Sequence, residues 1–169
     1  MTNAKASFQV VPYEAQHNRE NFSCGTPALD QYVKSQVSQD IRRRVASCFV
    51  ALAINQSVAG FYTLAATSVA LTDLPVHHAK KLPRYPLVPA VRMGRLAVSS
   101  DYQSLGLGAA LLADALRRAA RADIAAYAFV VDAKDSQAAR FYIHHGFIQL
   151  PDAVLTLFLP LASISLLVK

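Results

Sequence analysis

The segment "QSLGLG", Gln103–Gly108, places two glycines between an apolar run that predicts a strand and an amphipathic pattern that predicts a helix. Glycine lets backbone N–H groups approach a ligand closely, and the start of a helix carries partial positive charge. A glycine turn at this position therefore predicts a cradle for pyrophosphate. The alternative is that the glycines only make a tight turn. The spacing is not a dinucleotide-binding fingerprint, because Leu111 stands where that pattern requires glycine, and no Gly-Lys-Ser/Thr follows as in a P-loop.

An amphipathic helix is predicted earlier in the chain. Thr26 can cap it, and Pro27 suits its first turn. Its apolar residues recur every four positions, which indicates one buried stripe. The Arg42–Arg44 run then lies at the negative end of the helix dipole. The stripe consists of Leu29, Val33, Val37 and Ile41.

The rest of the chain predicts alternating strands and helices. Two β-rich runs flank a turn at Asn55–Ser57, which is typical of a hairpin, and the proline-rich residues 74–89 predict a loop. Residues 124–133 predict a strand that is buried on both faces. A helix is expected from a cap at Asp135 to a stop at Gly146, followed by at least one apolar strand. The pattern predicts an α/β (α+β) fold with a mixed, partly antiparallel sheet flanked by helices.

Length and composition restrict the class of protein. A chain of 169 residues with 53% hydrophobic residues fits a single domain over residues 1–169 with a sizeable core. Its apolar runs fall short of the roughly 20 residues that a membrane helix needs, and no signal peptide is recognisable, so we expect a cytoplasmic protein. Cys24 and Cys48 form no C-x-x-C pattern, so we expect two reduced thiols and no metal site.

Positive charge is concentrated in three clusters, which are the basic residues within 74–100, the Arg42–Arg44 run, and three arginines on the helix after the glycine turn. The formal net charge is +6, and residues 74–100 contain no Asp or Glu. Such clusters favour an anionic partner, with phosphate the usual candidate, although a solvated basic surface is the alternative. On the helix after the glycine turn, Asp114 shares one polar face with three arginines, so we expect those arginines to be solvated and Asp114 to be partly paired with them. The three are Arg117, Arg118 and Arg121.

These motifs resemble the GNAT N-acetyltransferase superfamily. Gln103-Ser104-Leu105-Gly106-Leu107-Gly108 is similar to its Arg/Gln-x-x-Gly-x-Gly/Ala signature, and "GRLAV" looks like the strand whose backbone pairs with the pantetheine arm. The later "ARFYIHHGF" is similar to the family's A-x-x-F-Y-x-x-x-G-F helix. The resemblance implies an acetyltransferase that takes acetyl-CoA as cosubstrate. It implies a cofactor site of Leu96, Ala97, Val98, Gln103, Ser104, Gly106, Leu107 and Gly108.

A narrower resemblance covers residues 22–159. "FSCGTPALDQYV", "QDIRRR", "RYPLVPAVRMGRLAV" and "FYIHHGF" look like GNAT toxins of bacterial type II toxin–antitoxin modules. This resemblance implies acetylation of the α-amino group of aminoacyl-tRNA, which blocks translation, a ribbon-helix-helix antitoxin and a homodimer. For the tRNA contacts we expect Arg84, Arg92 and Arg95. Alternatives are a GNAT enzyme acting on a small amine or a protein N-terminus, and a non-enzymatic module, which would not need an intact glycine turn.

The resemblance implies that the catalytic tyrosine of the family stands at Tyr142, which is therefore the expected catalytic acid. A phenol has a pKa of about 10, so it stays protonated at neutral pH and can donate to a departing thiolate. The alternative is a packed helix tyrosine, and the neighbouring Phe141 is expected in the core. The strand before the glycine turn has no carboxylate to act as base, which suits an α-amine with a pKa of about 8. His144 and His145 point about 100° apart and so cannot chelate one metal together, while His145 can neighbour Tyr142; their role stays open.

Overall fold

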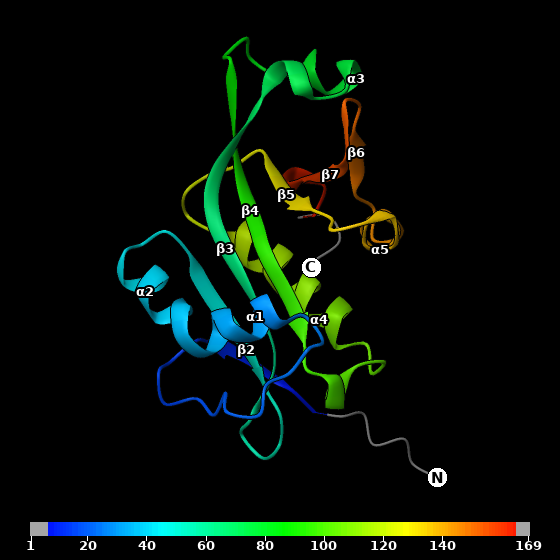
Figure 1. The fold of residues 1–169 in the computed structure, drawn as a ribbon. Coiled ribbons are helices and arrows are strands. Elements are labelled where there is room, and N and C mark those ends of the chain that lie inside the picture. Colours follow the sequence, from blue (N-terminus) through cyan, green and yellow to red (C-terminus); the bar gives the residue numbers. More distant parts are fainter. Residues whose placement is uncertain (1–6, 165–169) are drawn as a thin grey trace. The chain divides into compact units, whose positions relative to one another are not determined.

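The computed structural model describes residues 7–164 and contains a seven-stranded sheet (Figure 1). The strand order is β1-β2-β3-β4-β5-β7-β6. β4 and β5 pair in parallel, whereas the pairs β1–β2, β2–β3, β5–β7 and β6–β7 are antiparallel. The predicted mixed sheet and α+β class are therefore confirmed. The strands are β1 Gln9–Pro12, β2 Ser47–Leu52, β3 Val58–Ala70, β4 Leu87–Val98, β5 Ala128–Asp132, β6 Ile148–Leu150 and β7 Ala153–Pro160.

The helices occur in the predicted order, with one addition. α3 is a short helix inside the proline-rich segment that the sequence predicts as a loop. That expectation is wrong at residues 76–79, because Pro75 precedes the helix and leaves its interior free of proline. The helices are α1 Pro27–Gln31, α2 Val37–Arg42, α3 Val76–Ala79, α4 Leu107–Arg121 and α5 Ser136–His144, with a π-helical turn at Tyr32–Gln36 between α1 and α2.

The chain divides into two compact units. One contains the residues up to Ala65 together with Arg95–Ala115, and the other contains Ala66–Gly94 together with the chain from Leu116 onward. β3 and β4 each pass from one unit into the other. The expectation of one domain over residues 1–169 stays a prediction.

The first unit is built around the predicted amphipathic helix. Val33 and Val37 are fully buried, and Leu29 and Ile41 are half-buried against the same core. A repeat of four residues exceeds the 3.6 residues of an α-helical turn, so a regular helix would rotate this stripe away from the core. The wider π-helical turn corrects the drift. The same core includes Phe22, Tyr32, Cys48, Val50, Leu52, Val58, Phe61 and Ala97.

Thr26 does not cap this helix through its side chain. Its hydroxyl makes no capping hydrogen bond, and its backbone carbonyl accepts from the N–H groups of Leu29 and Asp30. The Asp30 carboxylate instead accepts from the backbone N–H of Cys24 at 2.8 Å. Thr26 is therefore the N-cap residue, with Pro27 in the first turn as predicted, but its side chain does not cap the helix. Asp30 fixes the chain just before the helix.

The predicted hairpin forms between β2 and β3, with register Cys48↔Thr63 to Ala51↔Gly60. Gln56 takes a left-handed φ of 67° in the turn, and Asn55 Oδ1 accepts from the Ser57 N–H at 3.1 Å. In the second unit, β5 is buried at four consecutive residues, as predicted for a strand covered on both faces. Its core comprises Val69, Leu71, Leu74, Val88, Ala90, Ala128, Val130, Leu150 and Phe158.

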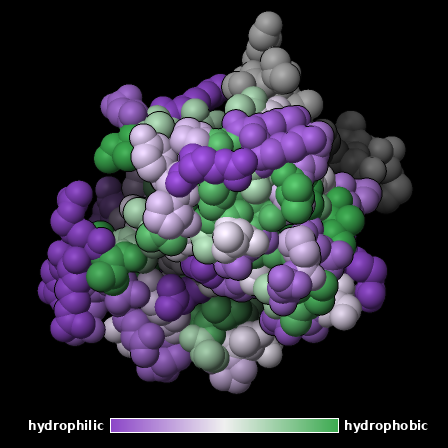
Figure 2. Space-filling model, turned by 90° about the horizontal axis from the view of Figure 1, so that it is seen from above, coloured by the Kyte–Doolittle hydropathy of each residue, from purple (hydrophilic) through white to green (hydrophobic). Residues whose placement is uncertain are grey.

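Large hydrophobic side chains also reach the surface. Figure 2 shows one face of the molecule, on which hydrophobic residues lie among hydrophilic ones. In the second unit the exposed members are Val76, Tyr85, Leu87, Ile124, Ile143, Val154 and Leu155. Within residues 7–164, no helix has both the length and the apolar character needed to cross a membrane.

Candidate active site

The glycine turn links a short 3-10 turn, Ser100–Tyr102, to the first residue of α4. Ser104 and Gly106 both adopt left-handed backbone conformations, with φ of 67° and 80°. The Gly106 carbonyl accepts the first helical hydrogen bond, from the Ala110 N–H at 3.1 Å. A Cβ placed on Gly106 would meet nothing within 4 Å. The backbone at the positive end of α4 is therefore open to a ligand.

The exposed side chain of Gln103 braces this turn. Its side-chain Nε2 donates to the carbonyl of Val98 at 2.9 Å and to the carbonyl of Cys24 at 3.2 Å. Ser100 Oγ adds a bond to the Ser23 carbonyl at 2.9 Å. The turn is thus tied both to the end of β4 and to the segment before α1. The link to Cys24 joins residues far apart in the sequence, and no pattern in the sequence predicts it.

The last residues of β4 are the predicted pantetheine contacts. The recorded pairing of β4 with β5 runs from Ala90 to Met93, whereas β4 itself continues to Val98. Ala97 is buried, and Leu96 and Val98 are half-buried. Leu96–Val98 therefore leads directly to the braced turn, in the order that the sequence predicts.

Gly60 on β3 was missed by the sequence reasoning. A Cβ there would lie 2.8 Å from Leu111 Cδ1 and 3.0 Å from the Ala97 carbonyl oxygen. Glycine is therefore required for the close approach of β3, β4 and α4 behind the turn. A glycine inside a strand pattern indicates such a close approach, so the sequence did contain a signal for the role of Gly60.

The spacing of apolar residues on α4 predicts a buried face of Leu112, Leu116 and Ala120. Leu112 is buried, but Leu116 and Ala120 are only half-buried. Tyr62, fully buried on β3, donates from its hydroxyl to Asp114 Oδ2 at 2.5 Å. Asp114 thus also accepts a hydrogen bond from the protein interior, because a buried tyrosine hydroxyl needs a polar partner. The buried face consists of Leu107, Leu111, Leu112, Ala115 and Ala119.

α5 begins and ends as predicted. Asp135 accepts from the Ala138 N–H at 2.8 Å, and Gly146 has a φ of 94° just after the helix. The Gly146 N–H donates to the Ile143 carbonyl, and the Phe147 N–H donates to the Tyr142 carbonyl at 3.1 Å. This pair of bonds is a Schellman motif, which usually includes a hydrophobic contact between the two residues of the longer bond.

Here that contact joins Tyr142 and Phe147. Their ring centroids are 5.5 Å apart at an interplanar angle of 60°, and Phe147 in turn contacts Phe129 on β5 at 6.0 Å. Tyr142 is only 8% exposed, and burial raises the pKa of its phenol to about 12. The helix stop thus fixes a neutral tyrosine among aromatic rings, and the phenol keeps its proton throughout the physiological range.

The neighbours of Tyr142 differ in part from expectation. Phe141 is half-buried rather than in the core, and its ring contacts both Tyr142 and His145. The His145 ring lies 4.8 Å from Phe141, and its backbone N–H donates to the Tyr142 carbonyl. Burial, with a smaller contribution from His144, lowers the pKa of His145, so this imidazole is neutral at pH 7.

Both thiols are free. Burial raises the pKa of Cys48 to about 12 and also raises the pKa of Cys24. Both groups are therefore protonated at neutral pH and are poor nucleophiles. Within residues 7–164, no three His, Cys, Asp or Glu side chains gather as a metal site would require.

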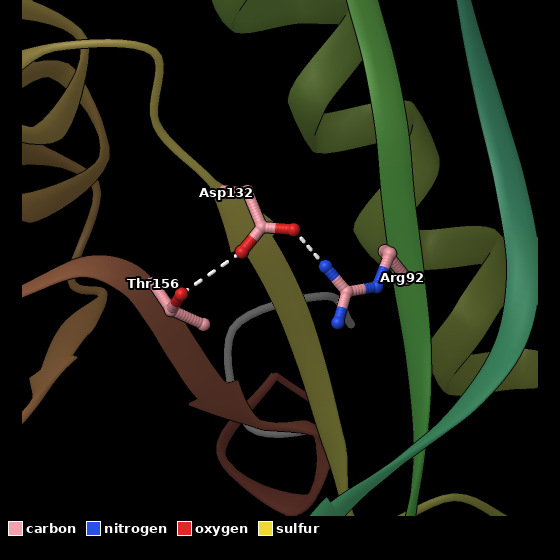
Figure 3. A network of polar contacts seen from close by, with 3 residues as sticks. All are labelled: Arg92, Asp132 and Thr156. Atoms are coloured by element: carbon pink, nitrogen blue, oxygen red, sulfur yellow. Dashed lines mark hydrogen bonds and ion pairs between the residues drawn. The ribbon is translucent and has the colours of Figure 1, made fainter. Parts of the chain in front are cut away.

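The three predicted tRNA-binding arginines have different surroundings. Arg84 is exposed in the segment before β4. Arg92, on β4, forms an ion pair with Asp132 at the end of β5, and Thr156 Oγ1 donates to the other carboxylate oxygen at 2.9 Å (Figure 3). Arg92 would have to share or leave Asp132 to contact a phosphate.

Arg95 lies against an aromatic ring of the first unit. Its guanidinium carbon is 3.6 Å from the centroid of the Tyr32 ring, a cation–π contact. Tyr32 is buried, and its hydroxyl donates to Asp40 at 2.9 Å. Burial and this hydrogen bond raise the pKa of the Tyr32 phenol. Arg95 therefore holds the π-helical turn next to the end of β4, a role that the sequence reasoning did not find.

Comparison with known proteins places this geometry in a family. Residues 44–149 match the acetyltransferase (GNAT) domain. The tRNA-acetylating toxin of Mycobacterium tuberculosis (strain ATCC 25618 / H37Rv) is 36% identical over 129 residues, which cover 75% of this chain and 76% of that protein.

Several solved structures are similar to this chain over almost its whole length. AtaT complexed with acetyl-methionyl-tRNAfMet has a TM-score of 0.88 at 28% identity and covers 96% of this chain and 100% of its own. AtaTR bound with acetyl-CoA has a TM-score of 0.82 at 27% identity, covering 96% and 98%. A tyrosine-to-phenylalanine mutant of AtaT bound to the C-terminus of the antitoxin AtaR has a TM-score of 0.81 at 25% identity, with the same coverage. The chain belongs to the GNAT acetyltransferases and is related to the tRNA-acetylating toxins of toxin–antitoxin systems.

Proposed function

We propose that this protein transfers the acetyl group of acetyl-CoA to the α-amino group of aminoacyl-tRNA and thereby blocks translation, as the toxin of a type II toxin–antitoxin pair. The observation that carries the proposal is the open, left-handed turn at the start of α4, in a chain related to tRNA-acetylating toxins. The turn supplies backbone N–H groups suited to bind phosphate, and the similarity to tRNA-acetylating toxins supports aminoacyl-tRNA as the acceptor.

Acetyl-CoA would be held by the end of β4 and by the glycine turn. The backbone of Leu96, Ala97 and Val98 is suited to pair with the pantetheine arm, because β4 continues to Val98, past Met93, the last residue that pairs with β5. Backbone N–H groups from Ser104 to Gly108 would bind the pyrophosphate at the positive end of α4. Gln103 contributes by bracing the turn, since its amide donates to two protein carbonyls. When bound, acetyl-CoA supplies an acetyl group activated as a thioester.

The reaction needs a neutral amine and a stabilised leaving group. The amine nitrogen forms a bond to the thioester carbonyl carbon, the carbon–sulfur bond breaks, and the amine loses one proton overall. An α-amine with a pKa of about 8 is partly neutral at pH 7 without a dedicated base. The Tyr142 phenol, fully protonated because its pKa is about 12, donates a hydrogen bond to the sulfur as negative charge develops there.

The same proposal covers the partners. Arg84, Arg92 and Arg95 would provide positive charge to the tRNA; Arg84 is exposed, whereas Arg92 and Arg95 already contact Asp132 and Tyr32. We further propose that the protein is a cytoplasmic homodimer, that a ribbon-helix-helix antitoxin neutralises it, and that the reaction needs no metal.

The direct test is transfer of labelled acetyl from acetyl-CoA to methionyl-tRNA by the purified protein. We expect label on the amino acid, recovered as N-acetylmethionine after mild base releases it from the tRNA. The competing acceptors are free methionine amide and a peptide with a free N-terminus. Label on those acceptors with none on the aminoacyl ester would replace the proposal by an ordinary small-amine or N-terminal acetyltransferase.

A further inference from the structure

Tyr85 presents an aromatic ring to solvent just before β4. The residue is 71% exposed, although tyrosine carries a large apolar surface that proteins usually cover at least in part. It lies between Pro83 and Pro86 in the sequence Pro83-Arg84-Tyr85-Pro86, and β4 begins at the next residue, Leu87.

The segment that carries Tyr85 is anchored at both ends. Leu82 is half-buried and packs against the core of the second unit. The Pro86 carbonyl accepts from the Leu71 N–H at 3.0 Å. Proline fixes φ at Pro83, between these anchors, and at Pro86, the second anchor. The ring is therefore held out by a stiff segment, so a ligand that stacks on it has little chain entropy to overcome.

Every charged side chain within residues 74–86 is positive, and the nearest carboxylate along the chain is Asp73, which is exposed. Lys80, Lys81 and Arg84 are all exposed, and no carboxylate occurs between residues 74 and 100. Lys81 Nζ lies 3.3 Å from His77 Nε2. The His78 ring packs on Phe158 at 5.3 Å, and burial, followed by the charges of His77 and Lys81, lowers its pKa.

An exposed aromatic ring flanked by lysine and arginine is the combination that binds unpaired nucleotides. Stacking needs a free base face, which a duplex does not offer, while the cations contact the phosphates on either side. Cations alone would suffice for an acidic protein surface, whereas a flat ring beside arginine is suited to a base. We infer that Tyr85 is a stacking platform for an unpaired base of the RNA substrate, with Arg84, Lys80 and Lys81 on the adjoining phosphates.

The inference rests on the proposed function for the identity of the RNA, and binding tests it separately from catalysis. The experiment measures the affinity of the full-length protein for uncharged initiator tRNA over a range of salt concentrations. Tyr85→Ala should weaken binding about 5- to 100-fold, the range for loss of one stacked base, with the salt dependence unchanged. Tyr85→Phe should bind within about twofold of the wild type, because phenylalanine keeps the ring. Tyr85→Leu should behave like Tyr85→Ala, which separates stacking from a general apolar contact.

Two further variants complete the design. Arg84→Gln should reduce the slope of log affinity against log salt by about one, because it removes one phosphate contact. Ile124→Ala removes another exposed hydrophobic side chain, 87% exposed and outside the basic segment, and should leave binding unchanged. Because Tyr85 is so exposed, none of its variants should lower the thermal midpoint by more than a degree or two.

Tyr85→Ala binding with wild-type affinity would overturn the inference, as would equal losses for Tyr85→Ala and Tyr85→Phe. Loss of affinity for an antitoxin peptide with tRNA binding intact would also overturn it and would make the segment a protein-binding surface. If tRNA binding depends on the Tyr85 ring but no acetyl reaches aminoacyl-tRNA, the proposed reaction fails while the stacking platform stands.

Discussion

The start of α4 and the end of α5 use the same backbone device for opposite purposes. Gly106 and Gly146 both adopt left-handed conformations, with φ of 80° and 94°. A Cβ placed on Gly106 would meet nothing within 4 Å, whereas Gly146 completes a Schellman motif in which the rings of Tyr142 and Phe147 are in contact. The first turn leaves backbone exposed for a ligand, and the second uses its hydrogen bonds to fix one side chain. Under the proposed function, the first turn would bind the cosubstrate, and the second would place the side chain that stabilises the leaving group.

The largest effect should come from removing the side chain that the second turn holds. Tyr142→Phe keeps the ring contacts with Phe141 and Phe147 but deletes the hydroxyl, so we expect the acetyl-transfer rate to fall about 10²- to 10⁴-fold. Acetyl-CoA affinity, measured by calorimetry, should stay within about twofold of the wild type, because the hydroxyl acts only on the leaving group. Tyr127→Phe, at a half-buried tyrosine, is the matched control. A rate within about threefold of the wild type would remove Tyr142 from the catalytic role.

Gly106→Ala should act on binding alone. A Cβ at φ of 80° strains the backbone by about 1–2 kcal/mol and points into the space that the pyrophosphate would occupy. We expect acetyl-CoA affinity to fall at least about tenfold, with a nearly normal rate at saturating acetyl-CoA. Calorimetry and initial rates check both quantities, and a normal affinity would show that the turn is only a chain reversal.

Gly146→Ala should act on the rate alone. The same left-handed strain applies, and the new Cβ would lie 4.0 Å from Leu159 Cδ1, so the main consequence is distortion of the Schellman motif that places Tyr142. We expect the maximal rate to fall about tenfold with acetyl-CoA affinity unchanged, while the thermal midpoint falls by several degrees. An unaltered maximal rate in the folded variant would mean that Tyr142 is placed by other contacts.

Gln103→Ala should have a smaller effect on the first turn. It deletes two hydrogen bonds, each worth about 0.5–1.5 kcal/mol, that tie the turn to Val98 and Cys24. We expect the acetyl-CoA KM to rise about three- to tenfold. If Gln103→Glu, which keeps the length but has no N–H donor, gave wild-type kinetics, the bracing role would be wrong.

The pH dependence should show no contribution from Tyr142 in the accessible range. Because its pKa is raised to about 12, the phenol remains a donor at every lower pH and loses its proton only above that value. The rate should therefore rise as the acceptor ammonium group loses its proton, at about pH 8, and then stay level to at least about pH 10. The rate can be measured by quenched flow, which is faster than hydrolysis of the aminoacyl ester. A fall in the acetyl-transfer rate near pH 10 would mean that Tyr142 has the ordinary pKa of a phenol.

Local patterns predicted most of the fold. The Asn55–Ser57 hairpin, the cap at Asp135, the stop at Gly146 and the strand–turn–helix around Gly106 are all decided by neighbouring residues, and all occur as predicted. The π-helical turn was not predicted, although the four-residue apolar repeat from Leu29 to Ile41 already implied more than 3.6 residues per turn.

Tertiary contacts account for what the sequence did not show. Arg95 was expected on the basis of charge to contact tRNA, but it lies over Tyr32, which belongs to a distant part of the sequence. Arg92 likewise meets Asp132 only because β4 and β5 pair in parallel. The family motif makes Tyr142 the candidate catalytic residue, which stays a prediction, while the burial of its side chain and its contact with Phe147 required the structure.

The separation of binding from catalysis is tested most directly by measuring acetyl-CoA affinity and single-turnover acetyl transfer for Gly106→Ala and Gly146→Ala side by side. Each variant controls for the backbone strain of the other, because the two glycines have similar φ. We predict a crossed result, in which Gly106→Ala loses affinity but keeps the single-turnover rate and Gly146→Ala loses the rate but keeps affinity. If both variants lost affinity and rate together, the effects on binding and on rate would not be separable, and the proposed division of roles would be contradicted.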